Sequence, residues 1–580
     1  MLNRTRTREF PIAAYDPFVT LGTRELLGRP ATLKDLIETL RPLDRDEIIP
    51  LCVRVLNVLA YDRRLRDSQL ELVAYLPQAA QARFKTFLRN RQPQYRLFHP
   101  FQQLILIHLA ARYARGQTSE PLPPKERRSR WAMASIQIND NLVKDLPSRS
   151  TPTKERRLYL FSEEVVRWEI SYPSRPVHSL ARMRSILLGA SEFGQPYVEA
   201  AARLRARFVQ QLGLDFETIF NLTAFFTSWW QLHSKKIPEN PDAAFIDRRH
   251  WLSKSSISRE TLERYVDRIA ISATDIESAF ERSGAESPFR DVLPFRSRPI
   301  LRLDEHRLAY LCPQFMSEKG GTDLLWLLAS DPGGEKQSQP FIQDFSVLYE
   351  RYVRSILEAM APERLGGTYV PNVKWSLGEE SGEIDGLFHF GKTLAVIEVK
   401  ASLLRQTTLS RGTADEVRSE LEKKFVVGDR TDGAKGLLQI ARAIRWLASE
   451  RRHGETVQGI DLGTIETILP ILIVHDRALR FPGLGAWFDG RMRDLLKKSW
   501  GRVGPLTICG TEDLESLEHL AATGERTFAD VLSEYDRRYM KAEAPLWNVY
   551  DSPADPHPRL DRITREWMRE LEEMGILPKE

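Results

Sequence analysis

The chain has 580 residues, of which 42% are hydrophobic and 28% are charged, and its formal net charge is +5. This composition is typical of folded globular domains and excludes wholesale disorder, while the length exceeds what one hydrophobic core usually supports. The positive charge is compatible with a polyanionic partner but is too small to indicate one by itself.

Targeting and redox signals are sparse. The sequence has no apolar run of about 18 residues, so it predicts no membrane span, and its N-terminus has no apolar run of signal-peptide length. Its three cysteines, Cys52, Cys312 and Cys509, are too far apart to suggest a disulfide framework or a zinc site. We therefore expect a protein of the reducing cytoplasm.

Residues 1–330 are predicted to be a mostly helical region that handles recognition or a partner. Apolar residues recur at helical spacing in Asp46–Tyr61 and Phe98–Tyr113. Between them and the next helices, residues 116–157 are polar and basic, which is typical of a solvated connection that splits the region into two subdomains; the alternative is a segment that contacts phosphates. Residues 298–313 are predicted to form a hairpin.

A domain boundary is predicted at Ser330–Gln339, which is rich in Gly, Pro, Ser and charge. We expect an α/β domain over residues 340–520 and a helical extension over 521–580. Within the α/β domain the patterns predict helix, three strands, helix, strand, helix and strand. The segments outside the central hairpin are Phe341–Met360 (helix), Thr368–Trp375 (strand), Ala414–Phe425 and Lys435–Leu447 (helices), and Thr467–Val474 and Leu506–Gly510 (strands).

The central stretch of this domain is a predicted β-hairpin that carries three charges. Two strand-like runs, 383–390 and 393–400, flank the turn at Gly391-Lys392. Asp385 lies in the first run, and Glu398 and Lys400 project from one face of the second because residues two apart share a face. Burying such groups is costly unless they are paired or bind a metal. One interpretation is a strand-end ion pair of Glu398 with Lys400, with Asp385 in a turn.

The hairpin sequence matches the pattern of a phosphate-binding loop, but such a loop is not favoured here. Residues 386–393 match the pattern GxxxxGK[ST] letter for letter. A phosphate cradle needs small residues followed by a helix N-terminus, whereas this stretch holds two Phe residues and leads into a strand.

The carboxylates favour a metal site instead. Asp385, Glu398 and the backbone carbonyl of Val399 supply the hard oxygen ligands that Mg²⁺ prefers, and Mn²⁺ can substitute. A bound divalent ion would lower the pKa of a water, and Lys400 beside it could orient or deprotonate that water and neutralise charge on a phosphoryl oxygen. The set is equipped for water attack on a phosphodiester.

The hairpin resembles the core of the PD-(D/E)xK nuclease superfamily, which has a restriction-endonuclease-like α-β-β-β-α-β fold. Asp385 matches the first acid of the family pattern, and Glu398 with Lys400 matches its (D/E)-x-K element. Glu350 matches an acid found on the opening helix, and Gln439 matches a glutamine on the helix after the third strand. Ile384 stands where the family name has proline, a position that varies among members.

The resemblance covers residues 341 to about 520 and implies a Mg²⁺-dependent nuclease that cuts DNA in bacterial restriction, anti-phage defence or repair. A partner protein that supplies recognition or ATPase activity, and a homodimer, stay open. Two alternatives remain: an RNA nuclease, and a non-cleaving binding or scaffold protein. Basic residues near the hairpin are expected to contact phosphates, although each is individually more typical of a solvated surface charge. They are Arg405, Arg411, Lys423, Lys424 and Lys435.

Overall fold

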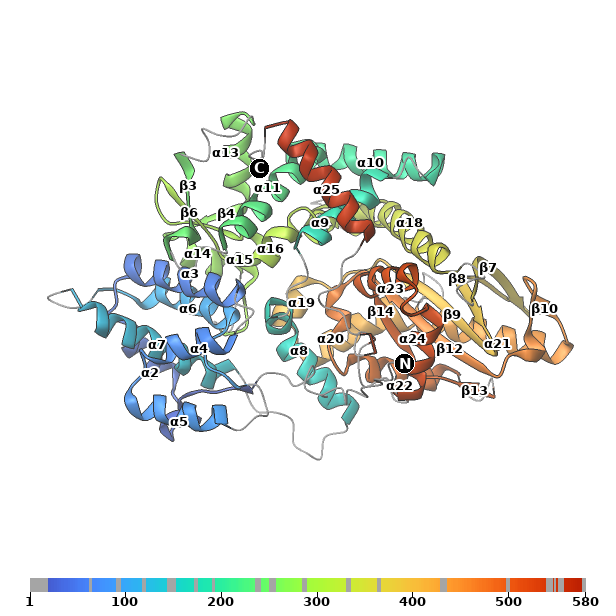
Figure 1. Cartoon of the computed structure of the whole chain (residues 1–580), viewed down its shortest axis with the longest axis horizontal. Coiled ribbons are helices and arrows are strands. Elements are labelled where there is room, and N and C mark those ends of the chain that lie inside the picture. The colour runs from blue at the N-terminus through green and yellow to red at the C-terminus, as the bar shows by residue number, and fades with distance from the viewer. Residues whose placement is uncertain are drawn as a thin grey trace, which may run out of the picture. The chain divides into compact units, whose positions relative to one another are not determined.

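The computed structural model describes residues 19–61, 65–89, 95–116, 121–142, 153–171, 176–189, 193–234, 241–249, 257–283, 289–329, 335–361, 367–427, 436–496, 501–538, 546, 549–550 and 558–575. It is a mixed α/β protein with helices in its N-terminal part and a mixed sheet in its C-terminal part (Figure 1). Within these ranges, no helix has both the length and the apolar character that a membrane crossing requires.

The chain divides into two compact units. Unit 1 comprises residues 1–145, 229–253 and 266–315, and unit 2 comprises residues 146–228, 254–265 and 316–580. Residues 146–228 therefore belong to the same unit as the C-terminal sheet, although they lie within the region expected to be a separate helical part.

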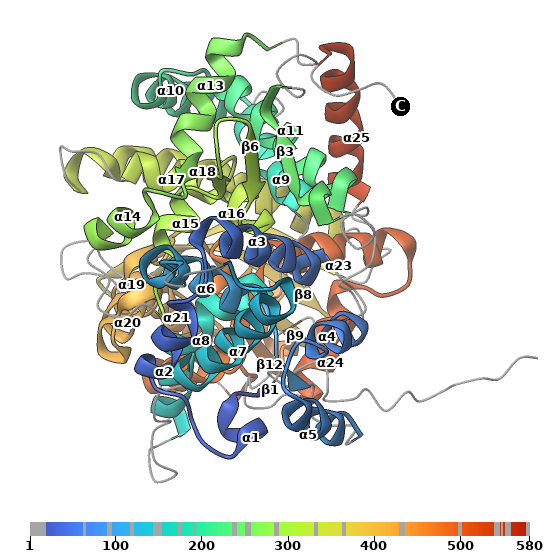
Figure 2. The ribbon, with the colours of Figure 1, turned by 90° about the vertical axis from the view of Figure 1, so that its left-hand side faces the viewer.

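Unit 1 consists of packed helices and a small sheet; its helices α1 to α7 can be followed in Figure 2. A four-stranded sheet has the order β3-β6-β5-β4, and β1 pairs with β2. The elements are β1 Val19–Thr20, α1 Thr23–Leu27, α2 Leu33–Leu40, α3 Arg45–Tyr61, α4 Leu65–Val73, α5 Gln78–Arg89, β2 Tyr95–Arg96, α6 Pro100–Tyr113, α7 Pro124–Leu142, β3 Phe245–Asp247, β4 Ala270–Ser272, α14 Ile276–Ser283, α15 Leu293–Ser297, β5 Ile300–Arg302 and β6 Arg307–Tyr310.

Helix α6 is the buried centre of unit 1. Residues 100–111 are buried, and the helix packs against α3 and α7. Its polar residue Gln102 is satisfied by the backbone carbonyls of Leu97 and Ser135 and by the side chain of Asn139. A buried amide is tolerated where its hydrogen bonds are made, so this network fixes α6 against α7.

Unit 2 contains the six-stranded mixed sheet. Its elements are α8 Thr153–Ser171, α9 Pro176–Leu188, α10 Gln195–Leu212, α17 Thr322–Ala329, α18 Glu335–Met360, β7 Thr368–Leu377, β8 Glu380–Phe390, β9 Thr393–Lys400, α19 Gln406–Arg411, α20 Ala414–Leu421, α21 Leu437–His453, β10 Thr456–Val457, β11 Ile460–Asp461, β12 Thr467–Val474, α22 Leu484–Leu496, β13 Arg502–Val503, β14 Thr507–Gly510, α23 Thr511–Thr523, α24 Phe528–Arg538 and α25 Pro558–Glu573. Helices α11 Phe216–Ser234, α13 Arg259–Ile269 and α16 Pro313–Glu318 have residues in both units.

The sheet has the order β13-β12-β9-β8-β7, and β14 also pairs with β12. Strands β7, β8 and β9 form an antiparallel meander, whereas β12 runs parallel to β9 and β14. Every residue of β12 is buried, which agrees with its continuous apolar sequence. Helices α18 and α21 pack on the strands of the hairpin.

Most expected elements of unit 2 are confirmed, and two polar stretches need correction, one in each unit. Residues 335–339, expected in the linker, form the first turns of α18, while residues 330–334 lie outside the described ranges. In unit 1, residues 124–142, expected in a solvated connection, form α7 and bury Trp131 and Ile136. The first turn of α7 is basic, so the sequence alone favours a solvated connection. The apolar residues that follow it are buried by tertiary packing, which stabilises the helix.

Candidate active site

The hairpin of β8 and β9 opens at one end. The cross-strand pairs described for these strands end at Gly386–Ile397. On its other edge β9 stays paired with β12 as far as Lys400, which lies opposite Val474. The last residues of β9 therefore present a backbone edge toward β8 where the ladder has stopped.

Asp385 occupies this opening. Its Oδ2 accepts a hydrogen bond of 2.6 Å from the backbone N–H of Val399. The hydroxyl of Tyr369 on β7 donates to the carbonyl of Asp385 at 3.3 Å. The next residue, Gly386, leaves space for the Tyr369 ring, because a Cβ there would collide with the ring. Asp385 is thus held from both neighbouring strands, with its carboxyl directed at β9.

The backbone carbonyl of Val399 faces the same opening. In an extended strand, the N–H and C=O of one residue point to the same edge. Since the N–H of Val399 meets Asp385, its carbonyl also lies on the β8 side. The carbonyl of Lys400 points the other way and accepts from His475 N–H at 3.0 Å. The Val399 carbonyl is therefore placed beside Asp385.

Glu398 and Lys400 meet as their shared strand face requires. Lys400 Nζ lies 2.5 Å from Glu398 Oε1, and the Glu398 side chain is only 1% exposed. Glu398 Oε2 is buried and has no hydrogen-bond partner among the described residues. Lys400 Nζ also donates to Gln439 Oε1 at 3.1 Å, and the same oxygen accepts from Gly436 N–H at 3.0 Å, where α21 begins. Gln439 thus joins the helix start to the lysine.

Glu350 approaches this group from α18. Burial raises the pKa of Glu350 to about 7; the negative charge of Asp385 adds to the shift, and the cations Lys400 and Arg354 oppose it. Burial is also the first cause of the raised pKa of Asp385 and of Glu398. Burial disfavours the charge of Lys400, but the surrounding carboxyls outweigh it and raise the pKa of the lysine. The five expected side chains therefore act on one another in one place.

This donor set fits a hard divalent cation. No group of three or more His, Cys, Asp and Glu residues stands ready to hold a metal ion in the described part of the chain. Two carboxylates with one backbone carbonyl form a smaller protein set, which leaves the other positions of Mg²⁺ to water and substrate, as that ion usually requires. Burying Glu398 Oε2 without a hydrogen-bond partner among the described residues costs free energy. A cation bound there would offset that cost.

The residues expected to contact phosphate differ in their surroundings. Lys424 forms an ion pair of 2.6 Å with Glu420 and donates to the carbonyl of Leu403. The Arg405 and Lys423 side chains are exposed, and Arg411 is half-buried. Lys435 lies outside the described residues.

Three further residues beside the carboxylates were not selected from the sequence. The charge of Arg354 lowers the pKa of Asp385, and Tyr369 donates a hydrogen bond to the backbone carbonyl of Asp385. Asn372 accepts a hydrogen bond from Arg354. The four-residue spacing of Glu350 and Arg354 was a usable signal, because such residues share a helix face. No local pattern marks Tyr369 or Asn372, which reach the site through the register of β7.

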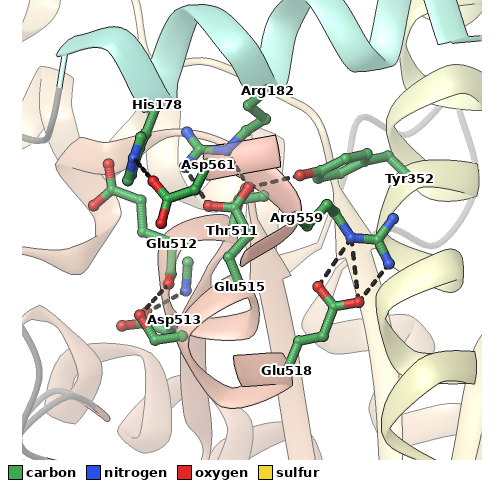
Figure 3. Close-up of polar contacts among 12 residues, drawn as sticks. His178, Arg182, Tyr352, Thr511, Glu512, Asp513, Glu515, Glu518, Arg559 and Asp561 are labelled. Carbon is green, nitrogen blue, oxygen red and sulfur yellow. Dashed lines mark hydrogen bonds and ion pairs between the residues drawn. The ribbon is translucent and has the colours of Figure 1, made fainter. Parts of the chain in front are cut away.

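A buried polar network holds α18, the helix that carries Glu350; its central residues Arg182, Tyr352 and Glu515 are labelled in Figure 3. Tyr352 donates to Glu515 Oε1 at 2.8 Å, and Arg182 of α9 binds both oxygens of Glu515 at 2.6 Å. The hydroxyl oxygen of Tyr349 lies 2.9 Å from the hydroxyl oxygen of Thr511, at hydrogen-bond distance. Helices α9, α18 and α23 are thereby joined by bonds that are satisfied only in one arrangement.

Comparisons of the chain with protein-family models, with curated proteins and with solved structures find no match.

Proposed function

We propose that unit 2 is a metal-dependent nuclease that hydrolyses DNA phosphodiester bonds. The observation that carries the proposal is the convergence of Asp385, Glu398 and Lys400 at the end of β9 where its ladder with β8 stops. The element order from α18 to β12 and the positions of Glu350 and Gln439 support assignment to the PD-(D/E)xK superfamily.

Each side chain has a role that follows from its position. Asp385, Glu398 and the Val399 carbonyl would hold Mg²⁺ or Mn²⁺, which when bound supplies an acidified water and stabilises charge on phosphoryl oxygen. The surrounding carboxyls raise the pKa of Lys400, and its ammonium would place a positive charge where negative charge develops. Gln439 keeps the lysine oriented, and Glu350 adds a nearby carboxyl. Water adds to phosphorus, the bond from phosphorus to the leaving sugar oxygen breaks, and that oxygen gains a proton.

The test is cleavage of labelled DNA and of matched RNA with Mg²⁺, with Mn²⁺ and with chelator. We expect the purified protein to cut DNA only with a divalent ion, and Lys400→Ala to cut about 10²–10³-fold more slowly because one stabilising charge is lost. The matched control is Lys392→Ala, which removes a lysine from the same hairpin that pairs with Glu466 at its exposed turn. Intact DNA under every ion would overturn the proposal, and cleavage of RNA alone would transfer it to an RNA nuclease.

A further inference from the structure

Arg354 differs from Arg351, the other arginine of helix α18, in what it binds. Its guanidinium donates to the side-chain oxygen of Asn372, a neutral amide. On the same helix, Arg351 pairs with Glu358 at 3.0 Å. Among the ion pairs of the described residues, none joins Arg354 to a carboxylate within 4.0 Å. Its charge is therefore anchored without being neutralised by a contacting carboxylate.

The anchor places this charge beside the carboxylates. Pro371 lies opposite Gly386 and Val373 opposite Ile384, so Asn372 falls between these pairs, at the register position of Asp385. The neighbouring pairs of β7 and β8 hold this position of β7 next to Asp385 on β8. Arg354 also follows Glu350 by one helical turn, which brings the two side chains to the same face of α18.

The electrostatics agree with this placement. The charge of Arg354 lowers the pKa of Glu350, of Asp385 and of Tyr369, against the larger effect of burial. A cation can act on all three only if it lies close to all three. The guanidinium thus borders the proposed reaction centre.

Asn372 has a backbone geometry suited to this task. Its φ is +51°, in the left-handed region that few residues other than glycine enter and that asparagine tolerates best. The neighbouring pairs of β7 and β8 continue on both sides, so the irregularity is confined to the position opposite Asp385. Non-glycine residues with positive φ occur disproportionately at binding and catalytic sites.

We infer that Arg354, held by Asn372, binds the nucleic-acid phosphate group at the carboxylate cluster. The inference rests on the proposed function, because the phosphate must reach the cluster that cleaves it. A planar guanidinium can donate two parallel hydrogen bonds to phosphate oxygens, and an amide anchor leaves its charge available for that anion. Carboxylates alone would repel a phosphate, so a cation at their border gives the substrate a place to bind.

The experiment measures binding separately from cleavage. In the Lys400→Ala background, the affinity for a labelled DNA duplex is measured by fluorescence anisotropy over a range of salt concentrations. We expect Arg354→Ala to bind about 10-fold or more weakly and to reduce the slope of log K against log salt by about one. Arg354→Lys should recover the slope but not the full affinity, because an ammonium keeps the charge without the planar fork.

Two further variants separate substrate binding from a structural role. Asn372→Gly keeps a residue that accepts positive φ but removes the anchor, so it should weaken binding while the salt slope is retained. Arg351→Ala removes an arginine from the same helix and should leave both quantities unchanged. The melting temperature of each variant checks that the fold is retained, and Arg354→Gln replaces Arg354→Ala if the latter does not fold.

The outcomes are distinct from those of the cleavage test. Unchanged affinity and salt slope in Arg354→Ala, or no DNA binding by the Lys400→Ala protein at low salt, would overturn the inference. If the protein cuts no nucleic acid but Arg354→Ala still loses affinity and slope, the phosphate site stands and the nuclease proposal fails. If the protein cuts DNA and Arg354→Ala binds and cuts normally, the nuclease stands and the phosphate site fails.

Discussion

A single oxygen of Gln439 serves two structures, which makes this residue informative. It accepts from Gly436 N–H at the start of α21 and from Lys400 Nζ. We predict that Gln439→Ala costs about 1 kcal/mol of stability through the lost helix cap. In the proposed enzyme it also lowers the cleavage rate about 10- to 100-fold, because an orienting group is removed.

The matched control for this prediction is Glu416→Ala. Glu416 accepts from the N–H of Thr413 at 2.7 Å and so caps α20 as Gln439 caps α21, without contact to the lysine. Melting temperatures and rates of both variants decide between the two roles. Equal activity in the two proteins would show that Gln439 acts only as a helix cap.

His475 predicts a pH dependence of stability. Its ring packs against Phe345 and Tyr349 with centroids 5.2 and 5.0 Å away, and neither ring nitrogen has a hydrogen-bond partner among the described residues. Burial lowers the pKa of His475 to about 3, and the charge of Arg182 adds to this. In the unfolded chain His475 takes up a proton near pH 6.5, whereas in the folded protein its ring stays neutral until about pH 3. The free energy of unfolding is therefore highest above pH 6.5 and decreases as the pH falls toward 3.

The corresponding variant is His475→Phe, which keeps an aromatic ring and removes the titrating group. Each pH unit in this window costs the native protein up to about 1.4 kcal/mol from this residue. We expect the melting temperature to fall less between pH 7.5 and pH 5.5 in the variant, as measured by calorimetry. The same fall in both proteins would contradict the prediction.

At the scale of elements, the network of α9, α18 and α23 depends on a buried charge pair. The Arg182 and Glu515 side chains are 8% and 1% exposed. We predict that Glu515→Ala destabilises the protein by about 3–5 kcal/mol, because the buried arginine loses its partner. Replacing both residues, with Arg182→Met and Glu515→Leu, should recover most of that loss. Chemical unfolding of these two variants and of the unchanged protein provides the measurement.

Asp344→Ala is the surface control for that set. It removes the partner of Arg203, whose side chain is 56% exposed, so solvent compensates and the effect should be small. A double replacement as unstable as Glu515→Ala would show that the apolar packing around the pair, rather than its charge balance, is what the single change disrupts.

At the scale of the whole molecule, unit 2 includes residues far from the sheet in sequence. Helix α8 packs on α20 and α22, and α9 supplies Arg182. A fragment of residues 335–580 lacks both helices, so it should expose apolar surface and leave Glu515 buried without its arginine. We predict that this fragment binds a hydrophobic dye and melts without a sharp transition, in contrast to the full chain. A sharp transition of 335–580 at the temperature of the full chain would contradict this.

Local sequence determined much of the C-terminal fold. The β-branched residues of Thr393–Lys400, the turn at Gly391 and the apolar run Thr467–Val474 predicted strands that the structure contains, because residue type, a turn signal and the two-residue period of a strand are properties of neighbouring residues. The same reasoning predicted that Glu398 and Lys400 share a face, and they form an ion pair. The chemical role of that pair stays a prediction.

Tertiary structure alone decided what lies across the strands and between distant segments. Asp385 meets the Val399 N–H because the pairing of β8 with β9 stops before it. Asn372 lies at the register position of Asp385 and holds Arg354 because of how β7 pairs with β8. No local sequence pattern specifies where such pairing stops and starts. Likewise, no local pattern indicated that residues 335–339 belong to α18 or that residues 146–228 belong to unit 2. Such contacts depend on summed burial over residues far apart in the chain, and this free energy exists only once the fold has formed.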